Sequence, residues 1–232
     1  MGDIDGDGST DVLVTNDLSG DVSLLRGDGT GDLATARSFV VDGQPVAVVL
    51  GDVDGDEKTD VLTANVVGSD GSVAILRNRG AGVLHAVEDV AVAMGPAGVS
   101  IGDFDDDALP DVVLAHESGT VLVLAAQAAE GFSVRDTIAT GGQLRRVTTA
   151  DLNGDGRPDV VALSTDASRV DWYENPTWKR RPVAKIDQPI DLAIHDIDRD
   201  GVLPVVQHPD VVVFERGQGN ERQHGRAAKQ EG

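Results

Sequence analysis

Short apolar runs recur along the chain and are separated by Gly, Asp, Asn and Pro. One such series is "PVAVVLG" (45–51), "VLTAN" (61–65), "VAILR" (73–77) and "HAVEDV" (85–90). Apolar runs of this length between turn residues predict β-strands. No segment shows the 3.6-residue periodicity of an amphipathic helix. The pattern therefore predicts an all-β protein.

The series of four runs repeats, and each copy is associated with a nine-residue acidic motif. The copies are "DIDGDGSTD" (3–11), "DVDGDEKTD" (52–60), "DFDDDALPD" (103–111), "DLNGDGRPD" (151–159) and a degenerate "DIDRDGVLP" (196–204). A near-constant period of this length indicates a repeat architecture, and four strands per repeat is typical of a propeller blade. We predict a β-propeller of about five four-stranded blades over residues 1–216, with repeats starting near residues 3, 52, 103, 151 and 196. The polar tail, 217–232, is predicted to be disordered.

Charge and cysteine content narrow the functional classes. With 40 acidic and 19 basic residues the formal net charge is −21, which disfavours nucleic acid and anionic membrane surfaces as partners. The absence of cysteine excludes disulfides and thiolate metal sites. No apolar stretch approaches the length of a membrane-spanning helix, and no signal peptide is visible ahead of Gly2.

The motif spacing points to a metal-ion site. Positions 1, 3, 5 and 9 carry carboxylates or a carboxamide, and alternate side chains of a loop can converge on one point. We expect position 7 to add its backbone carbonyl, at Ser9, Lys58, Leu109 and Arg157. Such a set of hard oxygen ligands suits Ca²⁺, which accepts six to eight oxygens in flexible geometry, better than Mg²⁺.

Two alternatives were weighed against this interpretation. An EF-hand loop requires a Glu at position 12 and flanking helices, but position 12 is Val14 in the first copy and Ala162 in the fourth, and the flanks are β-type. The motifs could also be solvated Asp-Gly turns, but four intact copies at a constant period disfavour that interpretation.

The motif, followed by "VVAL" in "ADLNGDGRPDVVAL" (150–163), resembles the FG-GAP/VCBS repeats of integrin-alpha N-terminal-like β-propellers. The resemblance implies a Ca²⁺ loop between the innermost strand of each blade and the next. It assigns as side-chain ligands Asp3, Asp5, Asp7 and Asp11; Asp52, Asp54, Asp56 and Asp60; Asp103, Asp105, Asp107 and Asp111; and Asp151, Asn153, Asp155 and Asp159.

The resemblance also indicates where the chain departs from the family. The fifth copy keeps Asp196, Asp198 and Asp200 but has Pro204 in place of the last carboxylate, so about four strong sites and a degenerate fifth are expected. The first blade should lack its inner strand. These ragged ends favour a piece of a longer protein or an open ring, whose edge strands invite association.

The predicted function is a calcium-binding, non-enzymatic scaffold for adhesion or ligand binding, extracellular or at the cell surface, with a protein or glycan ligand. The alternative is a carbohydrate-binding or accessory module of a secreted carbohydrate-active enzyme, using Trp172, Tyr173 and Trp178. We expect those rings to pack between strands instead. No catalytic residue is predicted, since the clustered carboxylates are assigned to the calcium loops.

Overall fold

The fold was analysed in a computed structural model, which describes residues 1–92, 95–127, 131–185, 191–194, 205–208, 212–213 and 226–227. These residues form strands and turns without any helix, which confirms the predicted all-β class. They accordingly contain no apolar helix of bilayer-spanning length.

Four antiparallel sheets follow one another along the chain, and in each the strands lie side by side in sequence order. The first has three strands: β1 (Val12–Asn16), β2 (Asp21–Leu25) and β3 (Arg37–Val40). The second contains β4 (Gln44–Gly51), β5 (Asp60–Val67), β6 (Asp70–Asn78) and β7 (Leu84–Val92). The third contains β8 (Pro96–Gly102), β9 (Asp111–His116), β10 (Thr120–Gln127) and β11 (Gly131–Ala139). The fourth contains β12 (Leu144–Ala150), β13 (Asp159–Ser164), β14 (Arg169–Glu174) and β15 (Lys179–Lys185).

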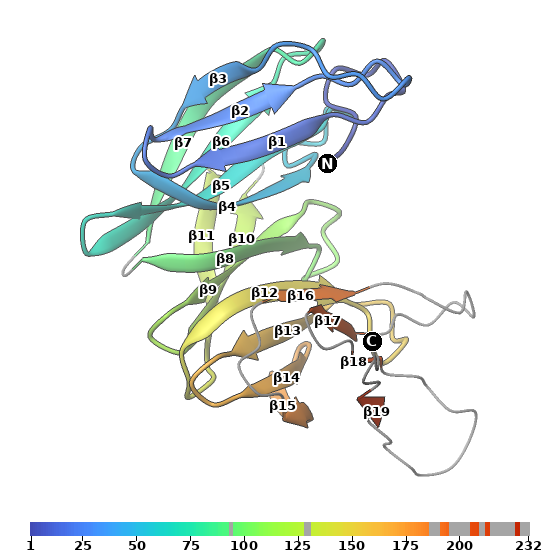
Figure 1. The fold of residues 1–232 in the computed structure, drawn as a ribbon. Coiled ribbons are helices and arrows are strands. Elements are labelled where there is room, and N and C mark those ends of the chain that lie inside the picture. Colours follow the sequence, from blue (N-terminus) through green and yellow to red (C-terminus); the bar gives the residue numbers. More distant parts are fainter. Residues whose placement is uncertain are drawn as a thin grey trace, which may run out of the picture.

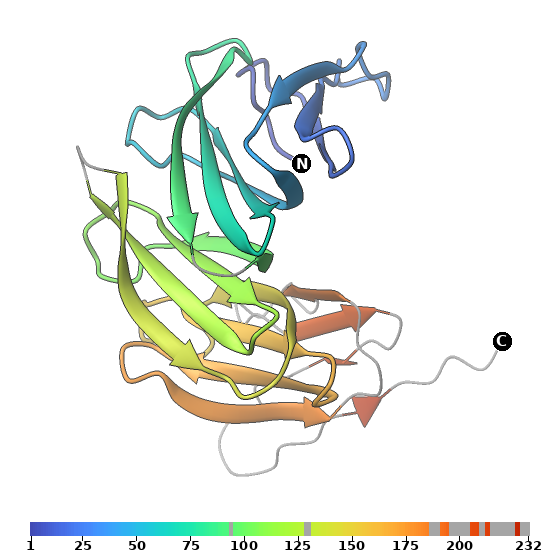
Figure 2. The ribbon, with the colours of Figure 1, turned by 90° about the vertical axis from the view of Figure 1, so that its left-hand side faces the viewer.

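Figures 1 and 2 show these sheets arranged as successive propeller blades, with β4, β8 and β12 next to one another. The first sheet lacks a strand before β1, as predicted. Beyond the fourth sheet, β16 (Asp191–Ile194) pairs with β17 (Val205–His208), and β18 (Val212–Val213) pairs with β19 (Arg226–Ala227). The degenerate fifth motif, with Asp196, Asp198 and Asp200, lies outside the described residues, as does most of the 217–232 tail.

The hydrophobic core lies between consecutive sheets, in three clusters. Ile4 and Leu76 contribute to the first cluster, Val53 and Leu114 to the second, and Phe104 to the third. Strands β5, β9 and β13 have a sheet on each side and are buried along almost their whole length. This explains why their sequences are continuous apolar runs instead of alternating ones.

The strand β1 shows the contrast. Within the described residues no sheet covers its outer side, and its own residues are only partly buried, with Val14 43% exposed. The same type of sequence is therefore buried or exposed according to whether a neighbouring blade covers it.

Candidate metal centre in the motif loops

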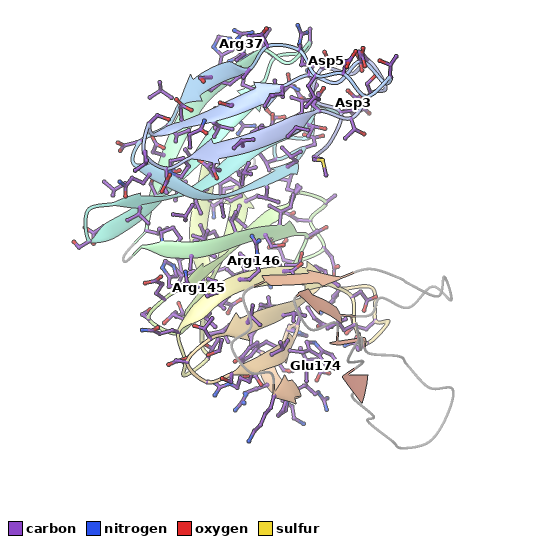
Figure 3. The ribbon with its side chains drawn as sticks, viewed as in Figure 1. Asp3, Asp5, Arg37, Arg145, Arg146 and Glu174 are labelled. Atoms are coloured by element: carbon purple, nitrogen blue, oxygen red, sulfur yellow. The ribbon has the colours of Figure 1, made fainter. Side chains whose placement is uncertain are left out.

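The nine-residue motifs form the loops that join β4 to β5, β8 to β9 and β12 to β13, and the first copy leads directly into β1. All four lie at the same end of their sheets, where Figure 3 shows Asp3 and Asp5 of the first copy. The repeat period thus places four acidic loops on one face of the propeller.

The ninth-position aspartate joins each loop to its sheet. In the second copy Asp60 is 1% exposed, and its carboxylate accepts hydrogen bonds from the backbone N–H of Val53 (3.2 Å) and of Asn78 (2.8 Å) at the end of β6. The other three copies repeat both bonds. The ninth-position residues are Asp11, Asp60, Asp111 and Asp159.

Burial of these carboxylates has an electrostatic cost. It raises the pKa of Asp60, Asp111 and Asp159 above the usual value, against the lowering effect of the two backbone hydrogen bonds. A cation placed beside these groups would compensate for the lost solvation of the charged form.

The first-position aspartate shapes the loop itself. In the fourth copy, Asp151 accepts the N–H of Gly154 on one carboxylate oxygen (2.7 Å) and that of Gly156 on the other (2.9 Å). The turn requires positive φ angles, which glycine adopts without penalty. In the third copy Asp106 (φ 63°) and Ala108 (φ 69°) adopt the same left-handed conformation without being glycine.

The loops bring together the first, third and ninth carboxylates of the first three copies. In each group, one ligand oxygen per residue lies within 4.8 Å of the others. The groups are Asp3, Asp5 and Asp11; Asp52, Asp54 and Asp60; and Asp103, Asp105 and Asp111. In the fourth copy the third position is Asn153, and the loop keeps the same backbone bonds.

The fifth-position carboxylates are bound to the backbone of their own loops. They accept the backbone N–H of the seventh position at 2.7–3.0 Å, in Asp7 with Ser9, Asp56 with Lys58, Asp107 with Leu109, and Asp155 with Arg157. Their role as ligands, and that of the seventh-position carbonyls, stays a prediction. The donor set brought together is purely carboxylate oxygen, which suits a hard cation such as Ca²⁺.

Sequence reasoning missed two groups of residues at the loops. Asn78 donates from its side chain to the carbonyl of Ile4 in the preceding repeat (2.6 Å), and Asn175 donates in the same way to Phe104 (3.1 Å). Arginines also pair with third-position aspartates, as Arg77 does with Asp54. The signal available in the sequence was that Asn recurs at the end of β6 in the second repeat and directly after β14 in the fourth.

A family model described as an FG-GAP-like repeat matches residues 3–63, 103–162 and 151–206. The chain belongs to this FG-GAP repeat family. The match confirms the resemblance drawn from the acidic motifs, and it covers the same loops that carry the carboxylate groups.

Solved structures support the FG-GAP propeller fold. The crystal structure of BBS1N in complex with ARL6DN, soaked with lead, has a TM-score of 0.62 at 14% identity and covers 91% of this chain. The form soaked with mercury has a TM-score of 0.61 at 14% identity over 87% of this chain. The chain spans 63% and 55% of the lengths of those two proteins. No match was found among curated proteins.

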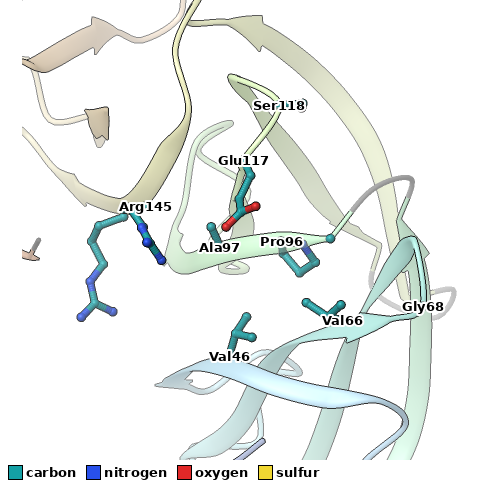
Figure 4. Close-up of a pocket in the computed structure, with 10 residues that line it drawn as sticks. Val46, Val66, Gly68, Pro96, Ala97, Glu117, Ser118 and Arg145 are labelled. Carbon is teal, nitrogen blue, oxygen red and sulfur yellow. The ribbon is translucent and has the colours of Figure 1, made fainter. Parts of the chain in front are cut away.

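A pocket of about 550 Å³ lies at the opposite end of the FG-GAP sheets from the motif loops. Figure 4 shows Val46, Ala97 and Arg145 around it, with Glu117 entering from the β9–β10 hairpin. These three residues occupy equivalent places in β4, β8 and β12, because each is skipped in the pairing with the next strand. Such a β-bulge redirects a side chain. The second, third and fourth blades thus each contribute one bulge residue to the pocket.

The aromatic cluster of the fourth sheet is occupied by packing. Tyr173 is buried, and burial raises the pKa of its hydroxyl to about 12. Trp178 packs against the third core cluster, with its ring 5.9 Å from that of Phe104. Trp172 is half-buried, and the Arg181 guanidinium lies over its ring at 5.6 Å. The three rings therefore do not form a common open platform for a sugar.

Proposed function

We propose that the chain is a non-enzymatic FG-GAP scaffold whose motif loops bind calcium ions and whose opposite face binds a ligand or partner protein. The observation that carries the proposal is the convergence of three aspartates in each of three loops, organised by one buried carboxylate. Like charges this close repel one another, and a divalent cation would remove that repulsion.

The calcium would act by stabilising the fold. Each ion would hold the motif loop. In the second repeat, Asp60 at the ninth position already connects that loop to the end of β6. Ligand binding to the folded state alone raises its stability in proportion to the logarithm of ligand concentration. Extracellular modules of weak affinity are saturated at millimolar Ca²⁺, which supports an extracellular or cell-surface location.

The partner would bind at the pocket end of the sheets. The bulge residues there are valine, alanine and arginine in successive repeats, so the side chain on the bulge differs from blade to blade while the loops stay alike. FG-GAP propellers are typically scaffolds for ligand or protein binding, and the similar BBS1N was crystallised in complex with ARL6DN. A protein partner, as in adhesion, is therefore favoured over a glycan.

Calorimetric titration of the chelator-stripped chain tests the calcium sites. We expect Ca²⁺ to bind at about four sites more tightly than Mg²⁺, because Mg²⁺ requires a tight octahedron. Asp54→Asn should remove or weaken one site. Asp70→Asn is the matched control, since Asp70 is exposed on the β5–β6 hairpin away from the loops.

The proposal fails if millimolar Ca²⁺ produces no binding heat, or if Mg²⁺ binds equally well. It also fails at the level of the residues if Asp54→Asn and Asp70→Asn bind calcium alike.

A further inference from the structure

An arginine faces the carboxylate group in each of the first three motif loops. Arg26 lies 3.2 Å from Asp5, Arg77 pairs with Asp54, and Arg135 lies 3.8 Å from Asp105. In every case the partner is the third-position aspartate. Backbone N–H groups bind the first- and ninth-position carboxylates of these loops, and at the fifth position Asp56 also pairs with Lys58.

The three arginines come from two different places in the repeat. Arg26 and Arg77 follow immediately after Leu25 and Leu76, which pair with Val12 and Val61 just beyond the ninth-position aspartate. The two arginines are therefore at equivalent positions in the repeat. The side chain of Arg26 is 53% exposed, and that of Arg77 is 27% exposed.

The third repeat has Ala125 at the equivalent position, next to Leu124, which pairs with Val112. The positive charge comes instead from Arg135, which is skipped at the bulge in the β10–β11 pairing. Its guanidinium also lies 3.9 Å from the buried Asp111 and 3.4 Å from Asp136. In the third repeat, where alanine holds the position of Arg77, a guanidinium from the neighbouring strand β11 therefore lies near the third-position aspartate instead.

The fourth repeat has no charge at the third position and no arginine at the position equivalent to Arg77. Its third position is the neutral Asn153, and the position equivalent to Arg77 is Glu174, which follows Tyr173. Glu174 pairs with Arg181 at 2.6 Å. The position of Arg77 is therefore held by an acid in the one described loop whose third position is neutral.

We propose that Arg26, Arg77 and Arg135 are built-in counter-cations of the first three loops. In the ion-free chain each neutralises the third-position aspartate, and a calcium ion must displace it to use that carboxylate. The arginines therefore stabilise the ion-free fold and lower the calcium affinity of their own loops, since an opposite charge within hydrogen-bond distance competes for the same oxygens. The inference rests on the proposed calcium binding.

The test compares Arg77→Gln with the parent in two measurements, the thermal melt in chelator and calorimetric titration with Ca²⁺. We expect the chelator melt to fall by a few degrees and one class of sites to bind Ca²⁺ about fivefold more tightly, the size typical of one partly exposed ion pair. Arg79→Gln is the control, because it makes the same charge change at an exposed residue two positions away.

A double-mutant cycle with Asp54→Asn isolates the pair. When Asp54 is already neutral, Arg77→Gln should no longer lower the melting temperature in chelator by the same amount. Arg26→Gln provides a second, more exposed position should Arg77→Gln fold poorly.

The two proposals fail separately. If the parent chain binds no calcium, the proposed function is wrong. If the parent binds calcium and Arg77→Gln leaves its affinity unchanged or weakens it, or if Arg79→Gln strengthens it equally, the arginines are not counter-cations and calcium binding still stands.

Discussion

The two ends of each blade use the repeat in opposite ways. At the motif end, the four loops share the same backbone hydrogen bonds to the first and ninth aspartates, from Asp3 and Asp11 to Asp151 and Asp159. At the pocket end, the second, third and fourth blades share a bulge but differ in the side chain placed on it, Val46, Ala97 or Arg145. The backbone bonds at the first end recur in every described loop, whereas the side chains at the second end differ from blade to blade.

The largest expected effect of a substitution is at the buried ninth position. Asp60→Ala leaves the N–H groups of Val53 and Asn78 without an acceptor, which should lower the free energy of unfolding by about 3 kcal/mol. Urea unfolding of the calcium-free chain measures it. Asp56→Ala, at the exposed fifth position, should cost much less, because water can replace its hydrogen bonds. Equal losses for the two variants would contradict the distinction drawn between these positions.

The contacts between blades should have the next largest effect. Asn78→Ala removes the side-chain hydrogen bonds to the carbonyls of Ile4 and Thr59 and should cost about 2 kcal/mol in the same experiment.

The third sheet offers the reverse change. Ala126 occupies the place of Asn78, and a cavity of about 40 Å³ lies between it and Val53. Ala126→Asn should therefore gain up to about 1 kcal/mol by reaching the Val53 carbonyl. A loss of stability in Ala126→Asn would show that the asparagine contact does not transfer between blades.

A smaller effect is expected from the backbone of the loops. Gly156 has φ +90° with open space around it, so Gly156→Ala should cost about 1 kcal/mol through conformation alone. Ala108→Gly, at the equivalent position of the third loop, should gain a similar amount because Ala108 already has a positive φ. Thermal melts in chelator check both. Changes of the same sign would contradict the shared loop conformation.

The smallest effect on stability is expected at the pocket end. Arg145 is exposed at the bulge of β12. Arg145→Ala should therefore change the unfolding free energy by less than about 0.5 kcal/mol. A loss comparable to that of Asn78→Ala would show that the bulge residues, too, are required by the fold.

The strands and loops could be predicted from the sequence because the signals are local and repeated. Apolar runs such as "VLTAN" and the acidic motif at 52–60 recur at one period, so each copy supports the others. The first, third and ninth positions converge as a loop of alternate side chains suggests. The fifth-position carboxylate accepts a hydrogen bond from the seventh-position backbone, as Asp56 does from the N–H of Lys58, and its part in ion binding stays a prediction.

The remaining features depend on contacts between segments distant in sequence. Asn78 contacts Ile4, and Arg135 reaches Asp105 only because a bulge in the β10–β11 pairing redirects it. The pocket likewise depends on bulges at Val46, Ala97 and Arg145, which change the strand register without leaving a residue pattern. Such features require the strand pairing to be known first.

The most direct test of the central claim is the thermal unfolding of the chelator-stripped chain, followed by far-ultraviolet circular dichroism with 1 mM Ca²⁺, with 1 mM Mg²⁺ or with neither. Four sites saturated about tenfold above their dissociation constants should raise the melting temperature by on the order of 10 °C. We predict that rise for Ca²⁺, a much smaller one for Mg²⁺, and a β-type spectrum throughout. Melting curves that coincide in all three conditions would show that the motif loops are acidic turns without a structural ion.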